Sequence, residues 1–97
     1  MTTTDSILTE AERLVTTDRQ ETYGPPHEDF AKTAEFWSTL LSARNGRRVT
    51  VTNQDVALMM VLLKVSRELH TPTRDNLVDA AGYLATLQMI YDATVDQ

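Results

Sequence analysis

The sequence predicts an all-α domain, and three observations lead to that prediction. Residues 56–65 are almost entirely apolar and rich in Leu, Met and Ala, which favours a buried helix over a strand. Apolar residues recur at helical spacing in residues 7–15 and again in residues 30–41. The single β-prone stretch, residues 47–52, has no second strand candidate with which it could pair. We therefore expect a bundle of four main helices.

Length and composition favour one domain. The chain has 97 residues, 41% of them hydrophobic, which suits a single domain over residues 1–97 with residues 1–4 as a flexible tail. Because a chain of this size buries a limited core by itself, we expect oligomerisation to complete the bundle, as a homodimer or a higher homo-oligomer.

Charge and residue usage exclude several classes of protein. The net charge of −5 argues against nonspecific nucleic-acid binding, which needs a basic surface. The absence of cysteine excludes disulfides and zinc-thiolate sites. The start of the sequence lacks the layout of a secretory signal, and the apolar run that breaks at Lys64 is too short to cross a bilayer. We expect a cytoplasmic protein that makes no membrane contact.

The first predicted helix begins at Asp5 or Ser6 as its N-cap and ends near Thr16. Its predicted buried stripe consists of Ile7, Leu8, Ala11, Leu14 and Val15. Residues 18–26 are expected to form a loop, because Gly24 precedes two prolines, and residues before proline avoid the α region. This loop either carries functional side chains or simply places Tyr23 in the core while its charged residues are solvated.

The second helix is predicted to start at Pro26, where acidic residues complement the helix dipole, and to end at Asn45-Gly46. Its predicted buried residues are Phe30, Ala34, Trp37 and Leu41, assisted by Leu40. Residues 47–52 are expected to form an extended lead-in to the next helix.

The third and fourth helices are predicted to form an antiparallel hairpin. Thr52 and Asp55 resemble a capping box at the start of the third helix, whose first half has no polar face and should be wrapped by other helices. A short break follows, with Thr73 as the next N-cap. The fourth helix, residues 75–93, is expected to bury Leu77, Ala80, Ala81, Leu84, Leu87 and Tyr91, with Asp75, Asp79 and Thr86 opposite. Gly82 in a helix interior indicates close approach to the backbone.

Polar residues gather near the closed end of this hairpin and suggest a site for a phosphate and a metal. Carboxylates without cysteine suit Mg²⁺, and we expect Glu68, Asp75 and Asp79 to bind it. Glu28 or Glu21 could orient a water, and a metal-bound water could attack a phosphorus. The alternative is ordinary surface ion pairs, Lys64–Glu68 and Arg74–Asp79 or Arg74–Asp75. The predicted phosphate-binding or nucleotide-binding residues are Arg19, Tyr23, His27, Lys64, Arg67, Arg74 and Asn76.

Three motifs carry a family resemblance over most of the chain: DR-x-x-x-YG-x-P, LLK-x-x-RE and RDNL-VD-x-AGY. With them the sequence resembles a small all-helical domain of bacteriophages and prophages, of poorly known function, whose phage members are described as MazG-like. In outline it is similar to the all-α nucleoside triphosphate pyrophosphohydrolases, which are oligomers that bind Mg²⁺ between helices. The EExxE motif of those enzymes is absent here, and residues 76–79 stand where ExxD would fall, with Asn76 in place of glutamate.

The resemblance implies a function and groups the site residues. It implies a phage enzyme in the host cytoplasm that cleaves a nucleoside or deoxynucleoside triphosphate to the monophosphate and pyrophosphate. It adds Asp18, Arg19, Tyr23, Gly24, Pro26 and His27 to the site and implies that their loop closes over the polar end of the hairpin. Two alternatives stay open: a non-catalytic module that binds or sequesters a nucleotide, and a phage protein that binds a host protein through the fourth helix.

Overall fold

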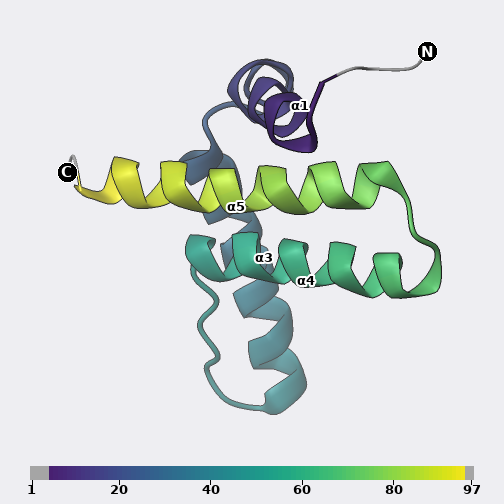
Figure 1. Ribbon diagram of the computed structural model, residues 1–97. Helices are drawn as coiled ribbons and strands as arrows, with labels where there is room; N and C mark the ends of the chain where they lie inside the picture. Colours follow the sequence, from purple (N-terminus) through teal and green to yellow (C-terminus); the bar gives the residue numbers. More distant parts are fainter. Residues whose placement is uncertain (1–4, 96–97) are drawn as a thin grey trace.

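The computed structural model describes residues 5–95, and these are helical in six segments with no strand among them (Figure 1). The predicted all-α class is therefore confirmed, while the tail predicted for residues 1–4 lies outside the described residues. None of the described helices is long and apolar enough to cross a membrane. The segments are α1 (Ile7–Arg13), the π-helix η1 (Leu14–Asp18), α2 (Arg19–Tyr23), α3 (Pro26–Asn45), α4 (Asn53–His70) and α5 (Arg74–Val95).

The first three segments form one continuous rod, so the loop predicted for residues 18–26 is wrong for most of its length. The backbone stays in the right-handed helical region at both junctions, at Leu14 and at Arg19. Thr16 and Thr17 do not end the helix, because their hydroxyls donate back to carbonyls of the preceding turn. The rod ends at Gly24, whose φ of 82° stops the helix as its place before two prolines suggested.

The segment between α3 and α4 is extended, as predicted, and two serines of α3 hold it. The Ser42 hydroxyl accepts a hydrogen bond from the Val49 N–H (2.8 Å) and donates one to the Val49 carbonyl (3.1 Å). Ser38 makes the same pair of bonds with Val51, at 2.8 and 3.2 Å. The two serine hydroxyls thus satisfy backbone N–H and carbonyl groups that a partner strand would otherwise bind.

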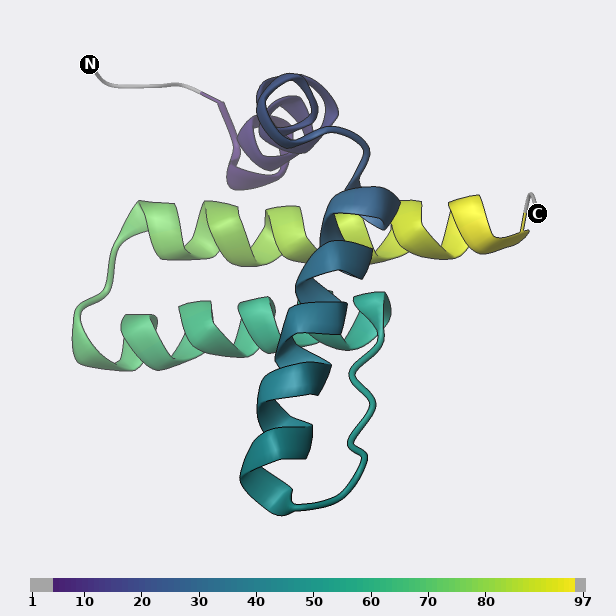
Figure 2. The same cartoon turned by 180° about the vertical axis from the view of Figure 1, so that it is seen from behind.

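Helices α4 and α5 form the predicted antiparallel hairpin. The capping box at its start is present, with the Asp55 N–H donating to Thr52 Oγ1 (3.1 Å) and the Thr52 N–H to Asp55 Oδ2 (3.0 Å). Thr73 caps α5 by accepting from the Asn76 N–H. The rod of α1, η1 and α2 crosses α5. Helix α3 crosses one face of the hairpin, which is the far face in Figure 1 and the near face in Figure 2. Among the described helices, α4 and α5 are the pair that run side by side (Figure 1).

The main core lies where α3, the first half of α4 and the second half of α5 meet. It contains Phe30, Ala34, Val51, Val56, Ala57 and Ile90, with Trp37 and Leu41 packed against them. Two residues predicted to be buried are instead largely exposed: Leu8 on α1 and Leu40 on α3. Each lies at the edge of its predicted stripe and faces away from the neighbouring helix.

The buried face predicted for α5 is wrong. Val78, Gly82, Thr86 and Ile90 are buried, whereas Leu77, Leu84 and Tyr91 are about half exposed. Helix α5 has apolar residues on two faces. On the buried face, Gly82 lets Val15 of the π-helix come close, and Ile90 packs in the main core. A Cβ at residue 82 would lie 3.2 Å from Val15 Cγ1, which confirms the close approach that Gly82 indicated.

Helix α4 is not wrapped by other helices, contrary to the expectation for its apolar first half. It packs against α5 and α3. Six of its large apolar residues are exposed: Leu58, Met59, Leu62, Leu63, Val65 and Leu69. One chain therefore leaves a large apolar surface on the helix that the sequence marks as the most buried.

Candidate functional site

A pocket of about 230 Å³ lies between the first helical rod and the hairpin. It brings together residues that are far apart in the sequence and that belong to the motifs singled out above. The rod contributes Ala11, Leu14, Val15 and Arg19, and the hairpin contributes Lys64, Val78, Asp79, Gly82 and Tyr83.

An ion pair crosses the hairpin at this pocket. Lys64 Nζ of α4 lies 2.9 Å from Asp79 Oδ2 of α5. The Lys64 side chain is only 13% exposed, whereas that of Asp79 is 39% exposed, so Lys64 is the more buried partner. Lys64 thus pairs with Asp79 across the hairpin. The surface pair with Glu68 of its own helix, which the sequence offered as an alternative, is not formed. An ammonium this buried needs a nearby anion.

Arg19 is held at the pocket by aromatic rings. Its guanidinium carbon lies 5.0 Å from the ring centre of Tyr23 and 5.4 Å from that of Tyr83, within the range of cation–π attraction. Tyr83 also packs against Phe30, with ring centres 6.2 Å apart. Arg19 directly follows the π-helix, and such widened turns frequently occur at functional sites.

A second polar cluster lies at the closed end of the hairpin, and its contacts cap the helix. Glu68 Oε1 accepts hydrogen bonds from the Thr73 N–H (3.0 Å) and from Asn76 Nδ2 (3.2 Å). Asn76 Nδ2 also donates to the Thr71 carbonyl (3.2 Å). Glu68 and Asn76, predicted near a metal or phosphate, therefore join the end of α4 to the start of α5.

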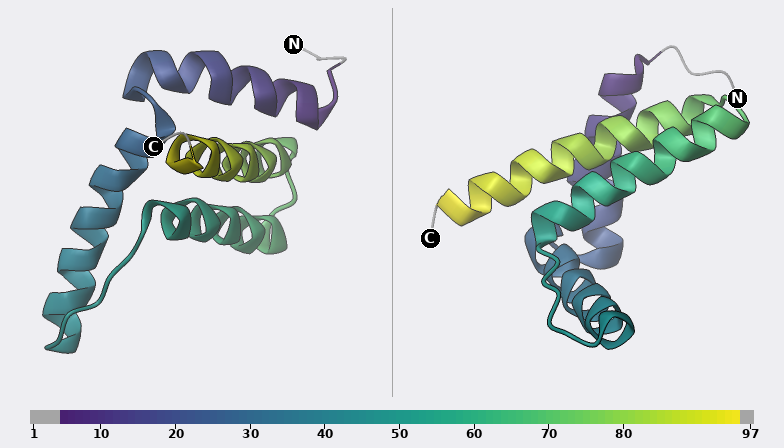
Figure 3. Two further views of the ribbon diagram at one scale, coloured as in Figure 1. Left: turned by 90° about the vertical axis from the view of Figure 1, so that its left-hand side faces the viewer. Right: turned by 90° about the horizontal axis from the view of Figure 1, so that it is seen from below.

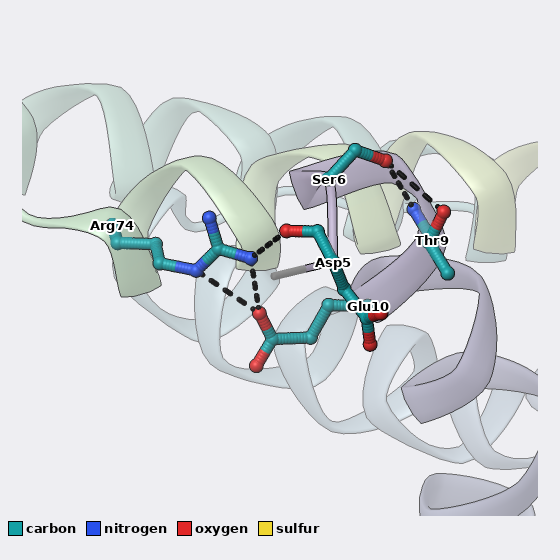
Figure 4. Close-up of polar contacts among 5 residues, drawn as sticks. All are labelled: Asp5, Ser6, Thr9, Glu10 and Arg74. Atoms are coloured by element: carbon teal, nitrogen blue, oxygen red, sulfur yellow. Dashed lines mark hydrogen bonds and ion pairs between the residues drawn. The ribbon is translucent and has the colours of Figure 1, made fainter. Parts of the chain in front are cut away.

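Arg74 connects this end of the hairpin to the start of α1 (Figure 4). Its Nη2 lies 2.8 Å from Glu10 Oε2 and donates to the Asp5 carbonyl at 2.8 Å, while its Nε donates to Glu10 at 3.2 Å. Arg74 thus pairs with the first helix rather than with an acidic residue of α5. The segment over the closed end is the start of α1, so the expectation that residues 18–28 close over it is wrong.

The other predicted site residues lie apart from the pocket. Arg67 and Asp75 are exposed near the closed end, and Glu21 is exposed on α2. His27 and Glu28 form the first turn of α3, where the His27 carbonyl accepts from Asn53 Nδ2 at 3.4 Å.

The structure thus brings three predicted residues together in one pocket: Arg19, Lys64 and Asp79. Tyr23 joins them through Arg19. Across residues 5–95, no group of three or more His, Asp or Glu side chains could hold a metal ion, so the predicted Mg²⁺ ligands Glu68, Asp75 and Asp79 do not gather at one site. Tyr83 was missed as a site residue, although it ends the RDNL-VD-x-AGY motif, because an aromatic at helical spacing suggests a core residue.

Comparisons with known proteins agree with the phage resemblance. The family described as "Domain of unknown function (DUF6378)" matches residues 6–91. The Gene 55 protein of Mycobacterium phage D29 is 36% identical over 93 residues, covering 95% of this chain and 58% of the relative. The Gene 55 protein of Mycobacterium phage L5 is 37% identical over 84 residues, covering 86% and 51%. The chain spans between half and three-fifths of the length of these relatives. No solved structure matches it.

Proposed function

The chain belongs to the DUF6378 family of domains of unknown function, and within that family we propose that it binds a nucleoside triphosphate and hydrolyses it to the monophosphate and pyrophosphate. The observation that carries this proposal is the convergence of Arg19, Lys64 and Asp79 on one pocket. Two cations and one carboxylate leave a net positive charge there in a chain whose net charge is −5.

The two cations suit phosphate groups in different ways. Arg19 packs over the rings of Tyr23 and Tyr83, and its N–H donors, arranged around the edge of the guanidinium, match phosphate oxygens. Lys64 supplies a point charge that is already desolvated and positioned by Asp79. Both cations are therefore held before a ligand arrives, which lowers the entropic cost of binding an anion.

The size of the pocket suggests which part of a nucleotide it receives. At about 230 Å³ it is smaller than the roughly 300–1,000 Å³ of a site that encloses a drug-sized ligand. The phosphate chain would lie inside, with the sugar and base at the mouth. Tyr23, which is 54% exposed, offers a ring on which a base could stack.

In the proposed reaction, water attacks the α-phosphorus, the bond from that phosphorus to the α,β-bridging oxygen breaks, and pyrophosphate leaves. The pocket could hold Mg²⁺ only together with a substrate, because this ion commonly uses one or two carboxylates and completes its ligands with substrate phosphates and water. Asp79 is the carboxylate at the pocket. The predicted ligands Asp75 and Glu68, and the predicted water-orienting residues Glu21 and Glu28, do not line this pocket and have no role in the proposed reaction. The ion would neutralise the charge of the phosphates.

The test is pyrophosphate release from each common nucleoside and deoxynucleoside triphosphate, with Mg²⁺ and with EDTA. We expect Asp79→Asn to reduce turnover by at least about a hundredfold, since a carboxylate that acts in the transition state contributes several kcal/mol. Asp92→Asn, an exposed change on the same helix, is the matched control. A folded Asp79→Asn protein with normal turnover would contradict the assignment.

A metal-free module that binds or sequesters a nucleotide is the second candidate. The observation in its favour is that Asp79 is already paired with Lys64 and that Glu68 accepts the capping bonds of α5. A thermal shift with nucleotide that persists in EDTA, without product, would select this function. The absence of any shift would contradict both candidates and favour the third reading, a protein partner in the host.

A further inference from the structure

One face of α4 carries apolar side chains that the chain itself leaves uncovered. Leu58, Leu62, Val65 and Leu69 are between 43% and 83% exposed. Their spacing of four, three and four residues is that of the seam of a coiled coil. At about 100° per residue they lie nearly opposite Met60, which packs on the core. We name these four residues the α4 seam.

Helix α5 carries a second seam of the same spacing. Leu77, Leu84 and Tyr91 follow at intervals of seven residues and are 45–52% exposed. Ala81 and Gln88 lie between them, so the pattern again alternates four and three. These residues, the α5 seam, lie opposite Thr86 and its buried neighbours on the wheel.

Both helices are open on the side away from α3. Figure 3 shows α3 on one side of the hairpin, and in Figure 1 no other described helix passes in front of α4 and α5. The exposed apolar area of the two seams is on the order of 500 Å² per chain, at roughly 30 Å² for each methylene group. A standard interface buries about 800 Å² per partner, a little over half of it apolar. The uncovered face therefore has the size of one complete interface.

We infer that two copies of this chain pack hairpin against hairpin through the α4 and α5 seams, forming a four-helix core across a two-fold axis. Such an interface needs a self-complementary surface, and two apolar seams with matching heptad spacing provide one. No charged residue lies between Val56 and Leu63, so the first half of the α4 face is free of like-charge repulsion when two copies meet.

The shape of the single chain supports the same arrangement. Its radius of gyration is 14.8 Å, against about 12–13 Å for a compact domain of this length. A second hairpin on the open side would cover the apolar half of α4 that the sequence marks as buried. This inference is independent of the nucleotide proposal.

The experiment compares Leu62→Glu with Leu8→Glu by analytical ultracentrifugation of the full chain over a range of concentrations. The two leucines are almost equally exposed, at 65% and 68%, but Leu8 lies on α1, outside both seams. The native protein and Leu8→Glu should sediment as dimers. Leu62→Glu should raise the dimer dissociation constant by at least about a hundredfold, because it would bury two unpaired carboxylates.

Three outcomes would overturn the inference: a native protein that is monomeric at every concentration, a Leu62→Glu variant that dimerises as tightly as the native protein, or equal losses in both variants. Circular dichroism shows whether each variant keeps its helices. A second readout is the melting temperature, which should rise with protein concentration for a dimer. That dependence should disappear in Leu62→Glu and persist in Leu8→Glu.

Discussion

The ion pair between Lys64 and Asp79 gives a prediction whose size follows from its burial. Exposed pairs contribute about 0.2–1 kcal/mol, and loss of one partner of a buried pair costs about 3–5 kcal/mol. With Lys64 13% exposed and Asp79 39% exposed, this pair lies between these limits. We expect a coupling free energy of about 1–2 kcal/mol from a double-mutant cycle of Lys64→Met and Asp79→Asn.

The two single variants should differ. Asp79→Asn leaves Lys64, the more buried side chain, without a counter-charge, whereas Lys64→Met leaves the more exposed Asp79 side chain alone. Asp79→Asn should therefore lower the free energy of unfolding more than Lys64→Met does. The assay is urea unfolding at one fixed protein concentration, since association also contributes to measured stability. Each kcal/mol corresponds to roughly 4–8 °C in melting temperature for a domain of this size.

The pair between Arg74 and Glu10 is the internal control for this cycle. Its side chains are 41% and 22% exposed, and the arginine is open to solvent. Its coupling should be below about 1 kcal/mol and should fall further at high salt, which screens exposed charges more than buried ones. A Lys64–Asp79 coupling below about 0.3 kcal/mol, or a larger cost for Lys64→Met than for Asp79→Asn, would refute the reasoning.

Two further predictions concern the stability of the helices that form the site. Thr52→Ala removes the oxygen that accepts from the Asp55 N–H, so the free energy of unfolding should fall by about 1 kcal/mol in urea titration; an unchanged midpoint would contradict the role of this cap. Gly82→Leu would drive a side chain into Val15, 3.2 Å from the position of its Cβ, and should cost about 1–3 kcal/mol or more in the same assay. A neutral Gly82→Leu variant would mean that η1 does not pack closely on α5 in solution.

Local signals in the sequence predicted most helix boundaries correctly. Thr52 with Asp55, Gly46 after α3 and Gly24 before two prolines each act through contacts or backbone angles within a few residues. The continuous rod was not predicted, because no cap or turn residue within residues 14–23 indicates that the helix continues. Residues 18–23 have the composition of a loop. They are nevertheless helical, because the chain continues from α1 through the π-helix η1, and simple periodicity does not reveal a π-helix.

The face of α5 shows why periodicity alone could not place the site. One face has Leu77, Leu84 and Tyr91, and another has Val78 and Ile90, so both are apolar at helical spacing. The larger side chains suggested the buried face, but Gly82 lets the π-helix approach the other one. Which face is buried depends on the partner helix, and Gly82 is the one residue of α5 that indicated from the sequence where a partner comes close.

The individual site residues were easier to predict than their partners. Lys64 and Asp79 were both predicted, yet the sequence suggested Lys64–Glu68, because residues four apart on one helix are the pairs that spacing reveals. Across a hairpin, the pairing depends on the register of two helices. That register is set at the closed end, where Glu68 and Asn76 join α4 to α5. Among the polar residues of these two motifs, Lys64 and Asp79 thus lie at the pocket, whereas Glu68 and Asn76 align the helices.

Neighbouring residues of α4 serve two different surfaces. Lys64 pairs with Asp79 across the hairpin and lines the pocket, while Val65, the next residue in the chain, belongs to the exposed α4 seam. A helix rigid enough to hold Lys64 close to Asp79 thereby also fixes the positions of the seam residues. The apolar run that makes α4 look like a buried helix is explained only in part by the core of one chain. Of the remainder, Met59 and Leu63 are exposed beside the α4 seam, and the seam itself, which shares no residue with the pocket, is what a second hairpin would cover.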